Sequence, residues 1–146
     1  MKATDFFTEK QKHDIVKAIK FAEHETSGEI RVHIELKCKV EVLDRAATIF
    51  AKLKMHKTKL RNGVLFYLAV EDRKFAIIGD IGINKVVPDG FWDSAKELLK
   101  ENFKQEKFTD GLVAGIHMAG EKLKANFPHQ ANDVNELPDE ISFGKK

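Results

Sequence analysis

Hydrophobic and polar residues follow two different periods along the chain, and each change of period marks a predicted helix or strand. Apolar residues recur at helical spacing in four segments: between Thr8 and Gly28, and over residues 43–55, 89–105 and 109–127. Three other segments have strand patterns: 29–38, 63–70 and 75–79. The first of these strands alternates strictly and is expected to be half-buried, whereas the other two are continuously apolar and are expected to be covered on both faces.

This order of elements predicts the fold class. A helix joins the first two strands, so they should be parallel, while a tight turn makes the third antiparallel to the second. We therefore expect an α/β fold, a three-layer αβα sandwich with a small mixed central sheet of three to four strands and helices on both faces. A fourth short strand is expected at 83–87. Thr8 with Gln11 predicts a capping box, and Thr109 is expected to cap the last helix.

One domain accounts for the length of the chain. The 146 residues are 42% hydrophobic and 33% charged, so they can form a core and a polar surface. Residues 1–128 are expected to form this domain. Residues 129–146 are polar, and we expect a flexible C-terminal tail.

Composition limits the possible partners. The net charge is +2 and no basic stripe stands out, which argues against nucleic-acid binding. The first residues lack an apolar signal region, and the longest apolar run, 64–70, is too short to span a membrane. Cys38 is the single cysteine, so no intrachain disulfide can form. A cytoplasmic protein without membrane or nucleic-acid contacts is the simplest interpretation.

Carboxylates and amides are predicted to gather at one edge of the sheet. The predicted strand directions bring together the start of the first strand, the start of the second and the end of the third. The candidate ligands there are Glu29, Asn62, Asp80, Asn84 and Asp89, with Asp93 one helical turn further on. Such hard oxygen donors suit Ca²⁺ or Mg²⁺, as one or two ions. The alternative is ordinary surface, since Asp89 and Asp93 are also favoured at a helix start without metal.

The same region carries a family resemblance. The segments "TSGEIRVHIE", "RNGVLFYLAVEDRKFAIIGDIGI", "VVPDGFWD" and "FTDG" together resemble the TPM domain, also called the TPM phosphatase domain, over roughly residues 5–128. The resemblance implies an αβα sandwich, divalent-cation binding in some members and an acid phosphatase activity attributed to plant members. The positions that match family elements are Asn62 to Leu65, Asp72, Arg73, Asp89 and Asp110.

No catalytic nucleophile is recognisable. Cys38 and Arg45 are one residue too far apart for a cysteine-phosphatase loop, and no aspartate phosphatase signature occurs. Three hypotheses follow: a metal-responsive interaction or regulatory module that binds divalent cations and an unidentified protein partner, a metal-dependent acid phosphatase acting on phosphate monoesters, or an acidic edge that is only solvated surface.

Overall fold

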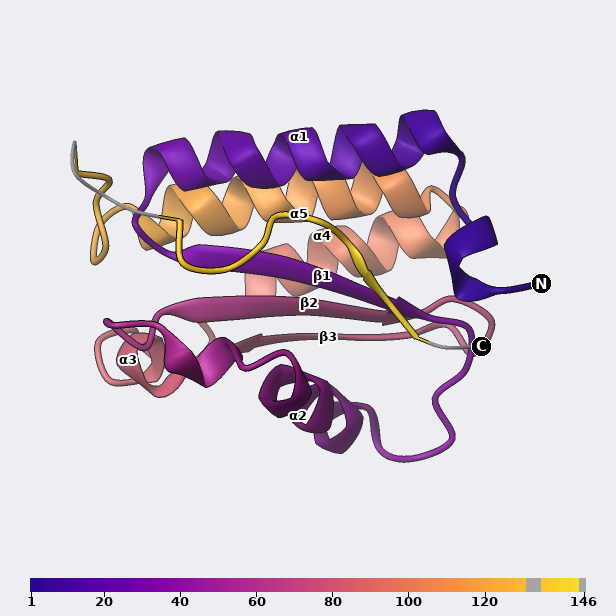
Figure 1. The fold of residues 1–146 in the computed structure, drawn as a ribbon, viewed down its shortest axis with the longest axis horizontal. Coiled ribbons are helices and arrows are strands. Elements are labelled where there is room, and N and C mark those ends of the chain that lie inside the picture. Colours follow the sequence, from indigo (N-terminus) through magenta and orange to yellow (C-terminus); the bar gives the residue numbers. More distant parts are fainter. Residues whose placement is uncertain (131–134, 145–146) are drawn as a thin grey trace.

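A mixed sheet lies at the centre of the computed structural model, which describes residues 1–130 and 135–144 (Figure 1). Within these residues the sheet has four strands in the order β3-β2-β1-β4. Their bounds are β1 Glu29–Glu35, β2 Gly63–Ala69, β3 Lys74–Gly79 and β4 Ser142–Phe143. The β1–β2 and β1–β4 pairs are parallel and the β2–β3 pair is antiparallel, so the predicted directions of the first three strands are confirmed.

Helices cover both faces of this sheet. The helices are α1 Glu9–Glu25, α2 Val42–Lys52, α3 Ile81–Asn84, α4 Asp93–Lys104 and α5 Phe108–Leu123, with 3₁₀ turns η1 Ala3–Asp5 and η2 Met55–Lys57. Figure 1 shows α1, α4 and α5 on one face and α2 on the other. This arrangement confirms the predicted αβα sandwich. No helix in the described part of the chain is both long and apolar enough to cross a membrane.

Side chains on the two faces of β2 pack in two separate apolar clusters. Val64, Phe66 and Leu68 pack in the larger cluster with α1, α4 and α5. Leu65 and Tyr67 belong to a smaller cluster that includes side chains of α2. Every residue of β2 is therefore buried, as its continuous apolar run predicts.

The prediction that β1 is half-buried is wrong, because all seven of its residues are buried. Its polar residues are only 9% (Arg31), 4% (His33) and 6% (Glu35) exposed. The carboxylate of Glu35 accepts hydrogen bonds from Arg45 of α2 at 2.9 and 2.5 Å and from the hydroxyl of Tyr67 at 2.5 Å. Polar partners thus allow these side chains to be buried.

The fourth strand lies elsewhere than predicted. Residues 83–87 are not a strand, and residues 83 and 84 belong to the short helix α3. Asp80 is the N-cap of this helix, and its side chain accepts the backbone N–H of Ile81 at 2.8 Å. The fourth strand, β4, comes from residues expected to be a flexible tail. Residues 135–144 follow β1, and Figure 1 shows this yellow segment beside it. Pairing with β1 satisfies backbone groups that an open sheet edge would leave unpaired.

Helix starts were predicted with mixed success. Thr8 and Gln11 form the predicted capping box at α1. Thr109, however, lies inside α5, whose N-cap is Lys107. The helix predicted from residue 89 begins at Asp93, because residues 88–92 form turns in which the Asp93 N–H donates to the carbonyl of Gly90 at 3.0 Å.

Candidate functional site: an acidic pocket beside the start of β1

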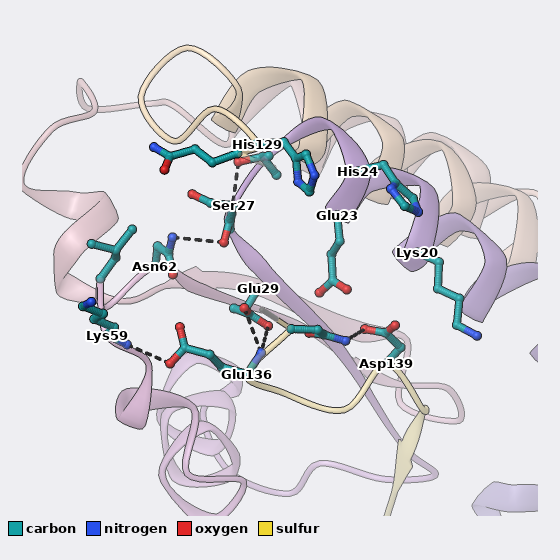
Figure 2. A pocket seen from close by; sticks show the side chains of 15 residues that line it. Lys20, Glu23, His24, Ser27, Glu29, Lys59, Asn62, His129, Glu136 and Asp139 are labelled. Carbon is teal, nitrogen blue, oxygen red and sulfur yellow. Dashed lines mark hydrogen bonds between the residues drawn. The ribbon is translucent and has the colours of Figure 1, made fainter. Parts of the chain in front are cut away.

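A cavity of about 710 Å³ opens where the end of α1, the start of β1, the loop before β2 and the C-terminal segment meet. Figure 2 shows Glu23, Glu29, Glu136 and Asp139 around it. These four carboxyl groups come from two regions of the chain, residues 23–29 and 136–139, that are far apart in sequence. We call this cavity with its four carboxyl groups the acidic pocket.

Glu29 holds the C-terminal segment in place. Its side chain is buried, and its carboxylate accepts the backbone N–H groups of Glu136 and Leu137 at 3.1 Å (Figure 2). Burial raises the pKa of Glu29, the two N–H groups oppose this effect, and the charges of Glu136 and Asp139 add to it. The carboxylate thus accepts hydrogen bonds from backbone donors, but it also lies close to other carboxyl groups.

The carboxyl group of Glu23, in α1, is partly buried next to the carboxyl group of Asp139. It accepts the backbone N–H of Ile30 at 3.0 Å and forms a side-chain hydrogen bond with Asp139. Burial and this carboxyl neighbour raise the pKa of Glu23 to about 10. Asp139 also accepts a hydrogen bond from the amide of Asn135 at 3.0 Å. At neutral pH the pocket therefore keeps a proton on Glu23, in contact with Asp139.

Asn62 joins the first residues of the two parallel strands. Its side-chain amide donates to the carbonyl of Ser27 at 3.3 Å, and its own carbonyl accepts the N–H of Glu29 at 3.2 Å (Figure 2). Asn62 is 2% exposed and lines the acidic pocket. It positions Glu29 at the pocket wall.

The other predicted site residues lie outside the acidic pocket. Asp80 is at the same sheet edge, as predicted from strand directions, but Arg61 holds its carboxylate with two bonds of 2.7 and 2.9 Å. Asn84 donates to the carbonyl of Gly79 at 3.2 Å, and both Asp89 and Asp93 are exposed around the start of α4. The structure thus brings Glu29 and Asn62 together and places Asp80, Asn84, Asp89 and Asp93 apart from them.

The described residues hold no ready-made metal cage. No three His, Cys, Asp or Glu side chains among them are arranged so that they could hold an ion as they stand. Four carboxyl groups nevertheless face one cavity, and two of them share a hydrogen bond. The arrangement can exchange protons, and its carboxyl groups offer oxygen ligands to a cation in a pocket that His24 and His129 also line.

Glu23, Glu136 and Asp139 are pocket residues that the sequence pattern does not predict. Glu23 looks like an ordinary polar position of an amphipathic helix, and the other two lie in the expected tail. The apolar residues Leu137 and "ISF" at 141–143 interrupt that polar tail. They are the signal that the segment packs against the domain.

Basic side chains lie beside the carboxyl groups. Lys20, His24 and Lys59 line the same pocket. The backbone N–H of Lys59 also donates to the carboxylate of Glu136 at 3.1 Å. A ligand that enters the pocket therefore meets groups of both charges.

Comparison with known proteins agrees with the αβα sandwich. The family model of the TPM domain matches residues 1–122. The NMR structure of BA42 protein from the psychrophilic bacterium Bizionia argentinensis is 51% identical, with a TM-score of 0.91, over 96% of this chain and 97% of that chain. No curated protein matches the chain.

Two more distant structures share the fold. The N-terminal domain of cg2496 protein from Corynebacterium glutamicum has a TM-score of 0.66 at 15% identity, over 98% of this chain and 83% of that one. The N-terminal domain of a protein from P. gingivalis has a TM-score of 0.69 at 16% identity, over 88% and 84%. The fold defines the class, an αβα sandwich built on a small mixed sheet. Because the family model covers most of the sequence, the chain belongs to the TPM domain family.

Proposed function

We propose that this TPM domain binds a divalent cation, Ca²⁺ or Mg²⁺, in the acidic pocket. The observation that supports this proposal is the carboxyl pair of Glu23 and Asp139, which share a hydrogen bond in the cavity that Glu29 also lines. Burying carboxyl groups beside each other is unfavourable unless they are protonated or bind a cation. One or two hard ions would relieve that repulsion.

The donor set fits this class of ion. Glu23, Glu29, Glu136 and Asp139 supply carboxylate oxygens, which hard cations prefer. The single cysteine, Cys38, is buried elsewhere and its thiol bonds to the carbonyl of Val40 at 3.3 Å. The donors favour Ca²⁺ and Mg²⁺ over thiophilic metals. Binding would require Glu23 to release its proton.

Calorimetric titration of chelator-treated protein with Ca²⁺, and then Mg²⁺, tests the proposal. Glu23→Gln is the most informative variant. Its neutral amide resembles the protonated carboxyl group of Glu23, so the pocket without an ion should be largely unchanged. We expect saturable binding that Glu23→Gln and Asp139→Asn each weaken at least tenfold. Glu101→Gln, at an exposed position of α4, serves as the matched control and should bind like the unmodified protein.

Two results would contradict this location. If neither ion gave a saturable heat of binding, the four carboxyl groups would have only a structural role. Binding lost in Asp80→Asn or Asp89→Asn but retained in Glu23→Gln would place the ion among the residues predicted from sequence. As ligands, Asp80, Asn84, Asp89 and Asp93 stay predictions.

The proposed role is that of a metal-responsive interaction module. Glu136 and Asp139 of the pocket belong to the C-terminal segment, while Glu23 and Glu29 belong to the body of the domain. A cation bound by both would fix the segment to the domain, and a protein partner could recognise the difference. Its location in the cytoplasm stays a prediction.

Metal-dependent hydrolysis of phosphate monoesters is the second candidate. The observation in its favour is that Lys20, His24 and Lys59 line the same pocket as the carboxyl groups and could hold a phosphate. A bound cation would supply Lewis acidity and an activated water. Hydrolysis of a generic phosphate monoester at acidic pH should then vanish with chelator and in Glu23→Gln. Metal binding without any turnover would exclude this candidate and retain the first.

A further inference from the structure

Residues 135–144 lie along the edge of β1 like a bound peptide. Backbone N–H groups make several of the contacts that hold them. Glu29 accepts the N–H groups of Glu136 and Leu137 at 3.1 Å, and the carbonyl of Ile34 accepts the N–H of Gly144 at 2.8 Å. Backbone contacts of this kind accept any extended segment and resemble the addition of a strand to a sheet edge.

Apolar side chains also hold the segment: Leu137 is the most buried of them, while Ile141 and Phe143 pack against the larger apolar cluster. Leu137 is 8% exposed and enters the apolar cluster between the sheet and α2, which also contains Leu65 and Tyr67. At Leu137 the groove thus offers a pocket for a large apolar side chain. This pocket lies next to the Glu29 carboxylate that accepts the backbone N–H groups of the segment.

Arg31 is a buried donor that the segment does not fully use. It is 9% exposed, and its Nη2 donates to the carbonyl of Glu140 at 3.2 Å. Among the described residues its Nε has no hydrogen-bond partner. A guanidinium group binds a carboxylate with two parallel bonds, whereas here it holds a single carbonyl oxygen. The segment brings the charges of Glu140 and Asp139 close to Arg31, so a ligand in the same place is expected to carry a carboxylate there as well.

We propose that the edge of β1 is a binding groove for an extended acidic peptide of a partner protein, and that residues 135–144 occupy this groove in the free protein. The ligand runs parallel to β1. It places a leucine-like side chain in the pocket of Leu137 and, three residues later, a carboxylate within reach of Arg31. This inference does not depend on cation binding.

The test loosens the native segment without altering the groove. In Gly144→Pro, the amide that donates to Ile34 is lost, and the added ring falls where a Cβ would lie 2.9 Å from the Cγ of Glu35. A fluorescent peptide of the native segment, NELPDEISFG, is titrated into the full-length variant, with anisotropy as the readout. We expect it to bind at least tenfold more tightly than to the unmodified protein. Val40→Ser, at an exposed position outside the groove, is the control and should bind as the unmodified protein does.

Peptide variants then test the chemistry. Replacing the leucine by alanine should abolish binding. Replacing its three carboxylates by amides should weaken binding at least fivefold, and this loss should disappear in the Arg31→Met protein. Amide NMR spectra of each protein show whether the native segment has left β1.

Three results would overturn the proposal. The first is a detached native segment together with no peptide binding, and the second is equal affinity for the acidic and neutral peptides. The third is a native segment that stays on β1 in both Gly144→Pro and Leu137→Ala, because the groove would then be a permanent part of the fold. A concentration-dependent dimer of Gly144→Pro that excludes the peptide would replace the acidic partner by a second copy of this chain.

Discussion

Glu23 couples the stability of the domain to pH. Its pKa is about 10 in the folded protein against an ordinary 4.5, so between these values folding retains a proton that the unfolded chain releases. The stabilising contribution is full below pH 4.5 and is lost as pH rises towards 10. Without divalent cations, we expect the free energy of unfolding to fall from pH 5 to 9, by at most about 1.4 kcal/mol per pH unit for one proton.

Urea unfolding in the presence of chelator measures this slope. Glu23→Gln should flatten it and should be the more stable protein at pH 9, because its amide is neutral throughout. Glu9→Gln, at an exposed position in the first turn of α1, provides the control. Parallel slopes in Glu23→Gln and the unmodified protein would show that Glu23 ionises normally.

Glu35 is the opposite case, a buried carboxylate that stays charged. Burial alone would raise its pKa, but hydrogen bonds from Arg45 and Tyr67, together with the nearby ring of His33, outweigh this effect and lower the pKa to about 2. We expect Glu35→Gln to destabilise the domain by about 3 kcal/mol, because Arg45 loses its charged partner. The stability due to Glu35 is present above pH 4.5 and is lost as pH falls towards 2.

Thermal and urea unfolding at pH 7 and pH 3 check this expectation. Asp14→Asn is the matched control, since its ion pair with Lys10 is solvent-exposed, and it should cost less than about 1 kcal/mol. If the difference between the Glu35→Gln and unmodified proteins were the same at both pH values, the pKa assignment would be wrong.

Among the elements, α3 depends on one glycine. A Cβ at Gly82 would lie 2.1 Å from the carbonyl oxygen of Leu60 and 2.6 Å from that of Arg61. These are backbone atoms and cannot yield as a side chain does. We expect Gly82→Ala to lower stability by about 2 kcal/mol or more and to shift α3 away from the loop that carries Arg61.

Gly79→Ala tests whether the effect is specific. A Cβ there would meet only the side chain of Ile83, at 3.4 Å, so the change in melting temperature should be small. Equal losses in the two variants would indicate general sensitivity of this sheet edge rather than a close contact of α3.

The elements could be predicted where a periodic pattern repeats. The parallel pair β1–β2 follows from the helix between them, and the hairpin β2–β3 follows from its tight turn. Residues 83–87 were misassigned because Ile83, Val86 and Val87 are as compatible with a short apolar strand as with a single helical turn. The N-cap Asp80, whose side chain accepts the N–H of Ile81, decides for the helix.

At the scale of the whole molecule, strand direction alone predicted that Glu29, Asn62 and Asp80 share one edge. It could not show that Arg61 neutralises Asp80, or that Glu23 points from α1 into the same space as Asp139. Such contacts join residues distant in sequence, and they leave no periodic signal. The C-terminal segment was misjudged for the same reason, since a few apolar anchors and backbone hydrogen bonds hold it.

The acidic pocket leads to a prediction for the entire domain. If Ca²⁺ or Mg²⁺ joins Glu23 and Glu29 to Glu136 and Asp139, then a hundredfold excess over the dissociation constant stabilises the folded protein by about 2.7 kcal/mol. The same ion should slow hydrogen exchange at the amides of residues 136 and 137. Their N–H groups point at Glu29, and they become exposed when the segment leaves.

Melting curves and hydrogen exchange, with and without the ion, test this coupling together. Glu23→Gln should lose both effects, while Glu101→Gln should retain both. Stabilisation without slower exchange at residues 136 and 137 would mean that the ion binds away from the C-terminal segment. Slower exchange at those amides without a higher melting temperature would limit the effect to the segment. The ion would then hold residues 135–144 on β1 without stabilising the rest of the domain.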